Sequence, residues 1–175
     1  MKLLYSIHRC DVSMLLWLLS ARRRDSYARV CRYISMTGDG PLYVVLCASV
    51  YSYGGIEARP FIHCVLLAFL IERPIYFVAK NGFKRNRPST ALKNFRSHIV
   101  PSDRFSFPSG HTSAAVLIAT LSSQYYPAIT FWVFTWASMV GTARIILGVH
   151  FPTDILVGAT MSANIAWVSA GILAS

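Results

Sequence analysis

Long apolar segments separated by short polar connections make up most of this chain. Five of them are long enough to cross a bilayer as helices, which takes about 20 residues each. They cover approximately residues 39–57, 60–79, 109–126, 128–147 and 152–173. The connections after the first segment and around Pro127 are short, so these neighbours are expected to form antiparallel hairpins. The pattern predicts an all-α fold, a polytopic transmembrane helix bundle, in a single domain over residues 1–175.

The N-terminal part follows a different pattern. The apolar run of residues 12–19 is too short to span a bilayer. Apolar residues then recur at helical spacing over residues 27–34, beside Arg29 and Arg32. This pattern is typical of helices that lie in the headgroup layer and direct arginines at anionic lipid.

We therefore predict an interfacial amphipathic segment over residues 1–36, followed by a helical bundle over residues 37–175. An alternative is that residues 3–21, which carry Arg9 and Asp11, form a sixth, imperfect span.

The order of the five segments places three points of the chain at one membrane face. In an up-and-down bundle, one side holds the end of the second segment near Lys80, the start of the third near Ser109 and the end of the fourth before His150. The long connection of residues 81–108 lies there too, and long loops in compact proteins are usually functional. We expect a functional site at this face.

The amino-acid composition supports a membrane protein with an anionic ligand. Charged residues make up 14% of the chain and hydrophobic residues 54%, whereas a soluble domain carries about 25% charged residues. Lys and Arg number 17, against 7 Asp and Glu. The basic residues lie between apolar segments and no nucleic-acid module is recognisable. Membrane lipids and phosphate, rather than nucleic acid, are therefore the expected partners.

Three short motifs occupy these three points of the chain. They are Lys80, six residues and Arg87-Pro88; Pro108-Ser109-Gly110-His111; and Arg144, five residues, His150, three residues and Asp154. Each motif is weak alone, because a basic pair at a helix end usually anchors the helix and a Pro-Ser-Gly run often only starts one. Together they bring three cations, two histidines and one carboxylate to one face, which predicts a catalytic site.

These residue types suit the transfer of a phosphoryl group. Its transition state spreads negative charge over the non-bridging oxygens, so catalysis is largely positioning and electrostatic stabilisation. Lys80, Arg87 and Arg144 can clamp those oxygens, the arginines in bidentate fashion. Ser109 is expected to cap a helix whose first amides bind the anion, and Gly110 lets a phosphate approach the backbone closely.

Two histidines allow a division of labour between a nucleophile and an acid. Asp154 falls in the first turn of the helix after His150, where its carboxylate can hold one ring nitrogen of that histidine. We therefore assign His150 as the nucleophile that forms a phosphohistidine, and His111 as the acid that protonates the leaving group. No cofactor or metal ion is expected, because three cations crowd the site, although two histidines and one aspartate could in principle bind zinc.

The three motifs, in this order and spacing, closely resemble the signature of the type 2 phosphatidic acid phosphatase superfamily. That family includes bacterial phosphatidylglycerophosphate and undecaprenyl-diphosphate phosphatases, animal lipid phosphate phosphatases and vanadium haloperoxidases. The resemblance covers residues 80–154 directly, and it implies a helical bundle with a metal-independent phosphohistidine mechanism. It also implies the acid His111, the nucleophile His150, its partner Asp154, and a phosphate site of Lys80, Arg87, Ser109, Gly110 and Arg144.

One position departs from the pattern of this family. The family usually has Ser immediately before the arginine of the third motif, and Ala143 stands there instead. Thr142 is one residue early and would point elsewhere on the helix. A lost hydroxyl hydrogen bond costs about 1 kcal/mol, so we expect modulated rather than abolished activity.

Other polar residues near the site have mostly structural interpretations. Glu72 and Arg73, inside the second segment, are expected to form an ion pair. Arg85 is one of several basic loop residues for which headgroup recognition and surface anchoring are both open. Asp103 could order the loop by pairing with one of them, and His98 is expected to be a solvated surface residue.

The sequence therefore predicts an integral-membrane lipid phosphatase that hydrolyses a phosphomonoester or diphosphate. Phosphatidylglycerophosphate, phosphatidic acid and undecaprenyl diphosphate are the candidate substrates, each keeping its acyl or prenyl chain in the bilayer. A lipid-phosphate binding or transport protein and a lipid phosphotransferase are the alternatives. A bacterial inner membrane is the expected location. Most Lys and Arg residues lie on the predicted side of the site, which favours the cytoplasmic face, whereas bacterial members of the family mostly resemble outward-facing enzymes.

Overall fold

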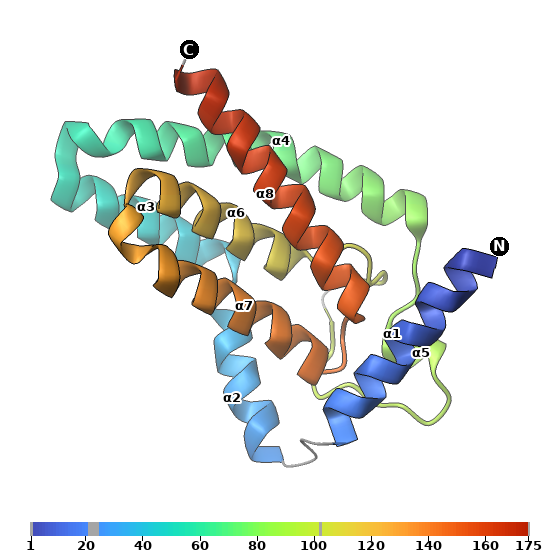
Figure 1. The fold of residues 1–175 in the computed structure, drawn as a ribbon. Helices are drawn as coiled ribbons and strands as arrows, with labels where there is room; N and C mark the ends of the chain where they lie inside the picture. Colours follow the sequence, from blue (N-terminus) through green and yellow to red (C-terminus); the bar gives the residue numbers. More distant parts are fainter. Residues whose placement is uncertain (1, 21–24, 102, 175) are drawn as a thin grey trace.

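The computed structural model describes residues 2–20, 25–101 and 103–174, which form a helical protein (Figure 1). In chain order the elements are α1 (Lys2–Ser20), α2 (Asp25–Met36), α3 (Gly40–Gly54), η1 (Gly55–Ala58), α4 (Arg59–Phe83), α5 (Pro88–Ala91), α6 (Gly110–Tyr125), η2 (Pro127–Ile129), α7 (Thr130–Ile146) and α8 (Pro152–Ala174). Across these described ranges there is no β-strand apart from an isolated bridge between Asn86 and Phe105. The predicted all-α fold class is confirmed.

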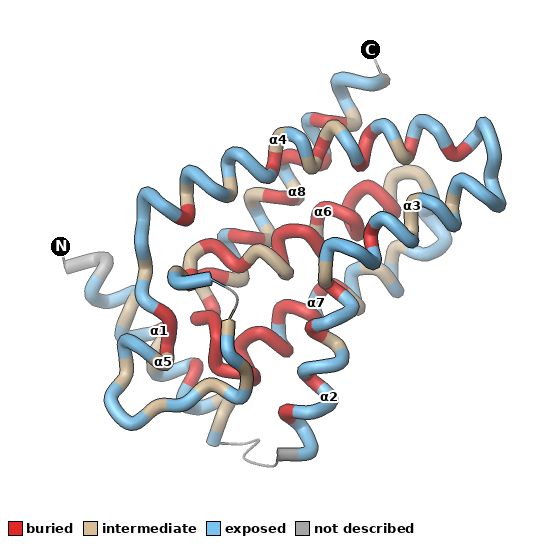
Figure 2. Tube along the Cα trace, turned by 180° about the vertical axis from the view of Figure 1, so that it is seen from behind, coloured by how far each residue is buried: buried red, intermediate tan, exposed pale blue. Residues whose placement is uncertain are grey.

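Helix α6 forms the centre of the bundle and packs against α4, α7 and α8. Most of its residues are buried (Figure 2). Small residues such as Ala114 and Ala115 let the neighbouring helices approach it closely, and Leu117 completes the core together with Phe61 of α4. Because α6 begins at Gly110, this central packing fixes the position of the second motif.

Among the described residues, three stretches are long and apolar enough to cross a membrane: Gly40–Phe83, Pro127–Ile146 and Pro152–Leu173. The first contains α3, η1 and α4, which fold into an antiparallel hairpin (Figure 1). Its outer surface carries exposed apolar side chains such as Leu70 and Phe77, as expected for a helix that faces lipid. Helix α6 matches the third predicted segment but has only 16 residues. The number of crossings, five or six, stays a prediction.

The four helices that carry the three motifs meet at one end of the bundle (Figure 1). Helix α4 ends at Phe83 and α7 ends at Ile146, while α6 begins at Gly110 and α8 begins at Pro152. All three motifs therefore lie at this end, as the alternating direction of the segments predicts.

The long connection between α4 and α6 folds over the same end. Lys84, in a left-handed conformation, ends α4. The chain beyond it is held by backbone hydrogen bonds from His98 to Leu147 (3.0 Å) and from Ser106 to Arg85 (2.9 Å). The connection is thereby fixed against the junction between α7 and α8.

Gly148 lies in this junction, directly under the loop. Its φ of +72° favours glycine, and a Cβ atom added there would come within 2.9 Å of the ring of Phe95. Glycine at this position therefore lets the loop pack onto the chain that leads to His150.

Helices α1 and α2 also pack against this end of the bundle. Helix α2 contacts α7, and α1 contacts α7 and α8. Helix α1 buries Asp11 and Leu15 while Trp17 remains 71% exposed, and α2 buries Ser35. Their placement in the headgroup layer stays a prediction. Residues 22–24, which count among the basic residues used to orient the chain, lie outside the described residues.

Candidate active site

The eight predicted site residues lie together at the end of the bundle just described. Gly110 and His111, at the start of α6, are partly exposed. The other six have exposed fractions of 6% or less: Lys80, Arg87, Ser109, Arg144, His150 and Asp154. Buried charges are costly unless they are paired and hydrogen-bonded, so the partners of these side chains define the site.

His150 lies on the connection between α7 and α8. Its Nε2 atom lies 3.4 Å from Nη1 of Arg87, and its Nδ1 atom lies 3.7 Å from Oδ2 of Asp154. The second distance is too long for a hydrogen bond, and the buried Nδ1 has no hydrogen-bond partner among the described residues. Burial lowers the pKa of His150 to about 4; Asp154 opposes this effect, and the charges of Arg87 and Arg144 reinforce it. The imidazole is therefore neutral at pH 7 and has an unprotonated nitrogen available for attack.

Asp154, in the first turn of α8, has both carboxylate oxygens occupied. Oδ2 accepts a hydrogen bond from the amide of Phe151 (2.8 Å), and Oδ1 accepts one from Nη1 of Arg85 (2.8 Å). The expectation that Arg85 recognises headgroups or anchors the surface is wrong, because its side chain is only 20% exposed and points onto this carboxylate. The physical reason is that a fully buried carboxylate needs a cation.

Asp103 joins two of the predicted phosphate-binding cations. Its Oδ2 atom lies 2.8 Å from Nζ of Lys80, and its Oδ1 atom accepts a hydrogen bond from Nη2 of Arg87. Arg87 also donates to the carbonyl oxygens of Asp103 (3.0 Å) and Val149 (2.7 Å). Burial alone would raise the pKa of Asp103, but the two cations hold it below its usual range. Asp103 therefore pairs with the site cations rather than with the other basic residues of the loop.

Arg144, in the last turn of α7, is hydrogen-bonded to a side chain of α2. Its Nη1 atom donates a hydrogen bond to Oγ of Ser35 (2.8 Å), whereas its buried Nε atom has no hydrogen-bond partner in the described part of the chain. The preceding Ala143 packs in a buried cluster with Cys31 of α2. Ser35 thus supplies a hydroxyl to the arginine from another helix. Sequence reasoning missed Ser35, because no local pattern connects residues 109 positions apart.

The start of α6 differs in detail from the expected cap. Ser109 is the N-cap residue, but its hydroxyl bonds the hydroxyl of Thr112 (3.0 Å) instead of a backbone amide. Gly110 lies against Tyr76, whose hydroxyl would be 3.0 Å from an added Cβ atom. The first amides of α6 have no side-chain cap, so this helix end can accept an anion.

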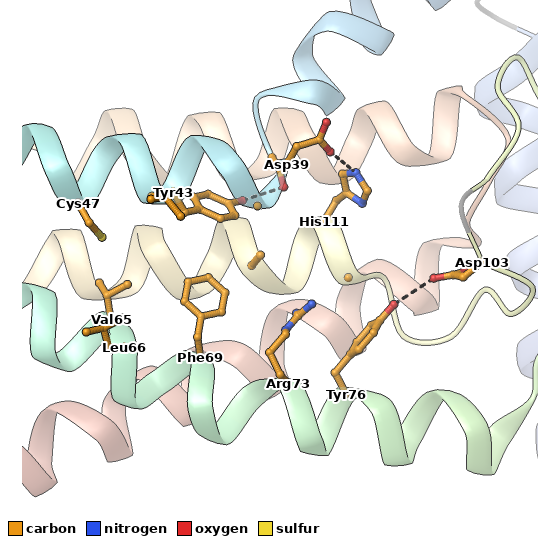
Figure 3. A pocket seen from close by; sticks show the side chains of 15 residues that line it. Asp39, Tyr43, Cys47, Val65, Leu66, Phe69, Arg73, Tyr76, Asp103 and His111 are labelled. Carbon is orange, nitrogen blue, oxygen red and sulfur yellow. Dashed lines mark hydrogen bonds and ion pairs between the residues drawn. The ribbon is translucent and has the colours of Figure 1, made fainter.

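His111 pairs with Asp39, the residue before α3 (Figure 3). Its Nε2 atom lies 2.8 Å from Oδ1 of Asp39. Sequence reasoning did not identify Asp39 as a site residue, because an acidic residue before Gly40-Pro41 is already explained as a helix start.

Two cavities meet at the pair of Asp39 and His111. The larger, about 660 Å³, lies between α3, α4 and α6 and is lined largely by apolar side chains such as Leu66 and Phe69 (Figure 3). We call it the apolar groove. The smaller, about 600 Å³, shares Asp39 and His111 and has Arg144 in its wall. We call it the polar cavity.

Glu72 is buried inside α4, where it forms the ion pair expected from the sequence. It contacts Nε of Arg73 at 2.5 Å and accepts a hydrogen bond from Ser113 of α6. His98 is exposed, as expected, in the wall of the polar cavity. Within the described ranges, no group of three or more His, Cys, Asp and Glu side chains is arranged to hold a metal ion.

Known proteins resemble this chain in sequence. The sequence profile of the PAP2 superfamily matches residues 59–174. Phosphatidylglycerophosphatase B of Bacillus subtilis is 29% identical over 140 residues, which cover 67% of this chain and 59% of that protein. Decaprenylphosphoryl-5-phosphoribose phosphatase of Mycolicibacterium smegmatis is 34% identical over 85 residues, 46% of this chain and 43% of that protein. The matched part of the chain thus spans roughly half the length of these curated relatives.

Two solved structures share the fold. LpxE of Aquifex aeolicus has a TM-score of 0.77 and 25% sequence identity, covering 91% of this chain and 94% of that one. A transmembrane PAP2-type phosphatidylglycerolphosphate phosphatase of Bacillus subtilis has a TM-score of 0.75 and 24% identity, covering 95% of this chain and 86% of that one. These neighbours and the three apolar stretches indicate an integral membrane protein. Since the profile matches well over half of the chain and includes every predicted site residue, the chain belongs to the PAP2 superfamily.

Proposed function

We propose that the protein is a membrane phosphatase that removes phosphate from a phosphomonoester or diphosphate of a lipid, through a phosphohistidine on His150. The observation that carries this proposal is the environment of that histidine. It is buried and neutral, with Nε2 at 3.4 Å from the guanidinium of Arg87 and Nδ1 at 3.7 Å from the carboxylate of Asp154. A nucleophile beside a phosphate-binding cation, with a carboxylate behind it, suits attack on phosphorus.

The substrate phosphate is proposed to lie between Lys80, Arg87 and Arg144, at the uncapped start of α6. Lys80 and Arg87 are paired with Asp103, so an incoming phosphate would replace this carboxylate. The Nε atom of Arg144 is buried without a partner among the described residues, and it can donate directly to a phosphate oxygen.

In the first chemical step, Nε2 of His150 forms a bond to phosphorus while the bond from phosphorus to the lipid oxygen breaks. His111, oriented by Asp39, gives its proton to that oxygen, and Asp154 stabilises the positive charge of the phosphorylated ring.

In the second step, water attacks phosphorus and gives a proton to His111. The bond from phosphorus to nitrogen breaks, and its electron pair returns to Nε2 of His150. The three cations supply the charge that a metal ion could otherwise provide, so we propose that the reaction needs no metal.

The apolar groove supports a lipid as the substrate. Its apolar walls can hold a hydrocarbon chain, and its polar end carries Asp39 and His111. The two curated relatives are named for phosphatidylglycerophosphate and for decaprenylphosphoryl-5-phosphoribose. Phosphatidylglycerophosphate, phosphatidic acid and undecaprenyl diphosphate are therefore the substrates that we propose to test.

We place the protein in a bacterial inner membrane as a bundle of five spans. The excess of basic residues at the end that carries the site supports a site at the cytoplasmic face.

The experiment is phosphate release by purified protein in detergent–lipid micelles. The three lipids are offered in the presence of EDTA, and wild type is compared with His150→Ala and with His63→Ala, an exposed histidine of α4 that serves as a control. Acid quenching during turnover then traps phosphate on the protein. We expect release and trapping by wild type and by His63→Ala, and neither by His150→Ala.

Either of two results would overturn this proposal. Release that continues in His150→Ala would exclude the phosphohistidine, and the absence of release from all three lipids would indicate binding or transport instead. Transfer of the phosphate from the substrate to a second lipid, without release of free phosphate, would identify a phosphotransferase.

A further inference from the structure

We propose that Asp11, in the N-terminal helix α1, is a positioning residue for this reaction that shares the positive charge of Arg85 with the carboxylate of Asp154. The inference rests on the proposed function. Its starting point is burial: Asp11 is 1% exposed, and a buried carboxylate is costly unless its oxygens are satisfied. The contacts of Asp11 lead directly to the carboxylate behind the nucleophile.

Both oxygens of Asp11 are engaged at the start of α8. Oδ1 accepts a hydrogen bond from the amide of Thr153 at 3.0 Å. Oδ2 accepts hydrogen bonds from the hydroxyl of Thr153 and from Nη2 of Arg85, each at 2.5 Å. Because Thr153 immediately precedes Asp154, Asp11 holds the turn that carries the carboxylate.

Arg85 lies between two carboxylates. Nη2 contacts Asp11, while Nη1 donates to Oδ1 of Asp154 (2.8 Å) and to Oγ1 of Thr153 (2.7 Å). The guanidinium also lies over the ring of Phe151, 4.3 Å from its centroid. The planar fork of an arginine fits two anions at once. The positive charge of Arg85 is therefore shared between Asp11 and Asp154. It offsets only part of the negative charge that Asp154 presents to His150.

This charge balance gives Asp11 a role beyond packing. Without Asp11, the undivided positive charge of Arg85 would act on Asp154 and weaken its stabilisation of the phosphohistidine. The charged groups that face His150 are Arg87 on the loop before α5, Arg144 of α7 and Asp154 of α8. Substitution of Asp11 removes none of them, so its effect reaches the histidine through Arg85.

The effect of Asp11 should appear in the chemical step rather than in substrate binding. Asp11 hydrogen-bonds Arg85 and Thr153 and none of the proposed phosphate-binding residues in the described part of the chain. It also lies outside the part of the chain that the family profile matches, which begins at residue 59. The N-terminal helix therefore adds a component that the three motifs do not contain.

The test is a double-mutant cycle on the full chain with Asp11→Asn, Arg85→Gln and the double variant. Glu57→Gln, an exposed carboxylate of η1, is the control. Steady-state kcat and KM and the pH dependence of the phosphorylation rate are measured for each protein. Thermal unfolding in detergent checks that each variant is folded at the assay temperature.

We expect Asp11→Asn to lower kcat about tenfold with KM changed less than about twofold. The acid limb of its pH profile should move to lower pH by roughly half a unit, because the uncompensated cation disfavours protonated His150. Arg85→Gln should move this limb to higher pH, since it removes the cation. The double variant should have the kcat and the acid limb of Arg85→Gln alone, because Asp11 acts on the reaction only through Arg85.

Three outcomes would overturn the inference. The first is that Asp11→Asn keeps the kcat and the pH profile of wild type. The second is that the effects of the two substitutions on kcat multiply in the double variant, and the third is that the acid limb moves in the same direction in Asp11→Asn and Arg85→Gln. If Asp11→Asn is unfolded at the assay temperature, Arg85→Gln carries the test, and an acid limb at or below the wild-type position contradicts the inference. A wild-type chain without turnover would overturn the proposed function itself, whereas an active wild type with an unaffected Asp11→Asn overturns this inference alone.

Discussion

Replacing Ser35 by alanine tests whether helix α2 takes part in phosphate binding. Ser35 is 3% exposed, and its hydroxyl accepts a hydrogen bond from Nη1 of Arg144 at 2.8 Å. The substitution removes this acceptor and leaves a second nitrogen of Arg144, besides Nε, without a partner. The guanidinium should then sample orientations that no longer meet the phosphate.

The size of the effect follows from the kind of contact. A hydrogen bond to a charged group contributes about 1.5–3 kcal/mol. Arg144 borders the polar cavity, so water can replace part of the lost contact, which leaves about 1–1.5 kcal/mol. This corresponds to a loss of about five- to twelvefold in kcat/KM.

The assay compares kcat/KM for lipid hydrolysis, and inhibition by inorganic phosphate, between wild type and Ser35→Ala. Ser26→Ala is the matched control, because Ser26 is exposed on the same helix. Both kcat/KM and the affinity for inorganic phosphate should fall by a similar factor in Ser35→Ala only. Wild-type kinetics in Ser35→Ala, or an equal loss in Ser26→Ala, would show that the hydroxyl does not hold Arg144 for phosphate binding.

Three other perturbations test the nucleophile, the loop and the backbone. On the acid side, kcat/KM should fall about tenfold per pH unit below pH 4, because only unprotonated His150 attacks and its pKa in the free enzyme is about 4. An acid-side decline that begins near pH 6.5, the ordinary value, would contradict the burial argument. Asp103→Asn should tighten inhibition by inorganic phosphate about fivefold, since it removes a 40% exposed carboxylate from the site cations; an inhibition constant equal to that of wild type would show that this carboxylate does not compete. Gly148→Ala should lower the free energy of unfolding by about 1–3 kcal/mol, because alanine is strained at φ +72° and meets Phe95 at 2.9 Å. Thermal unfolding checks this against Gly171→Ala, where an added Cβ atom meets nothing within 4 Å, and equal stability of the two variants would refute it.

The sequence predicts the convergence of the three motifs because helical spans alternate in direction. Lys80 lies near the end of one predicted apolar segment and Ser109 begins the next, so a hairpin topology alone brings them to the same end. The structure confirms this arrangement and adds that α6, the helix that Ser109 caps, is the central element. The order and spacing of the segments were therefore sufficient to predict that the residues within the three motifs lie close together.

The partners of these residues could not be predicted in the same way. Ser35 and Asp11 reach the site from α2 and α1, and Asp39 reaches it from the connection between α2 and α3. The packing of these segments against the bundle end leaves no periodic trace in the sequence. Asp11 carried the only usable signal, since an acidic residue next to the apolar run of α1 suggests a buried charge with a partner. Arg85 was misread because its basic neighbours in the loop made it look like one more surface cation.

The shared wall between the apolar groove and the polar cavity has a consequence for product release. Under the proposed function, the lipid alcohol would be left in the groove and could diffuse sideways into the bilayer. Inorganic phosphate would be left beside Arg144 in the polar cavity and would depart towards water. Because the two products occupy different volumes on either side of Asp39 and His111, they could be bound at the same time. Each would then inhibit the enzyme without excluding the other, and neither product would have to wait for the other to leave.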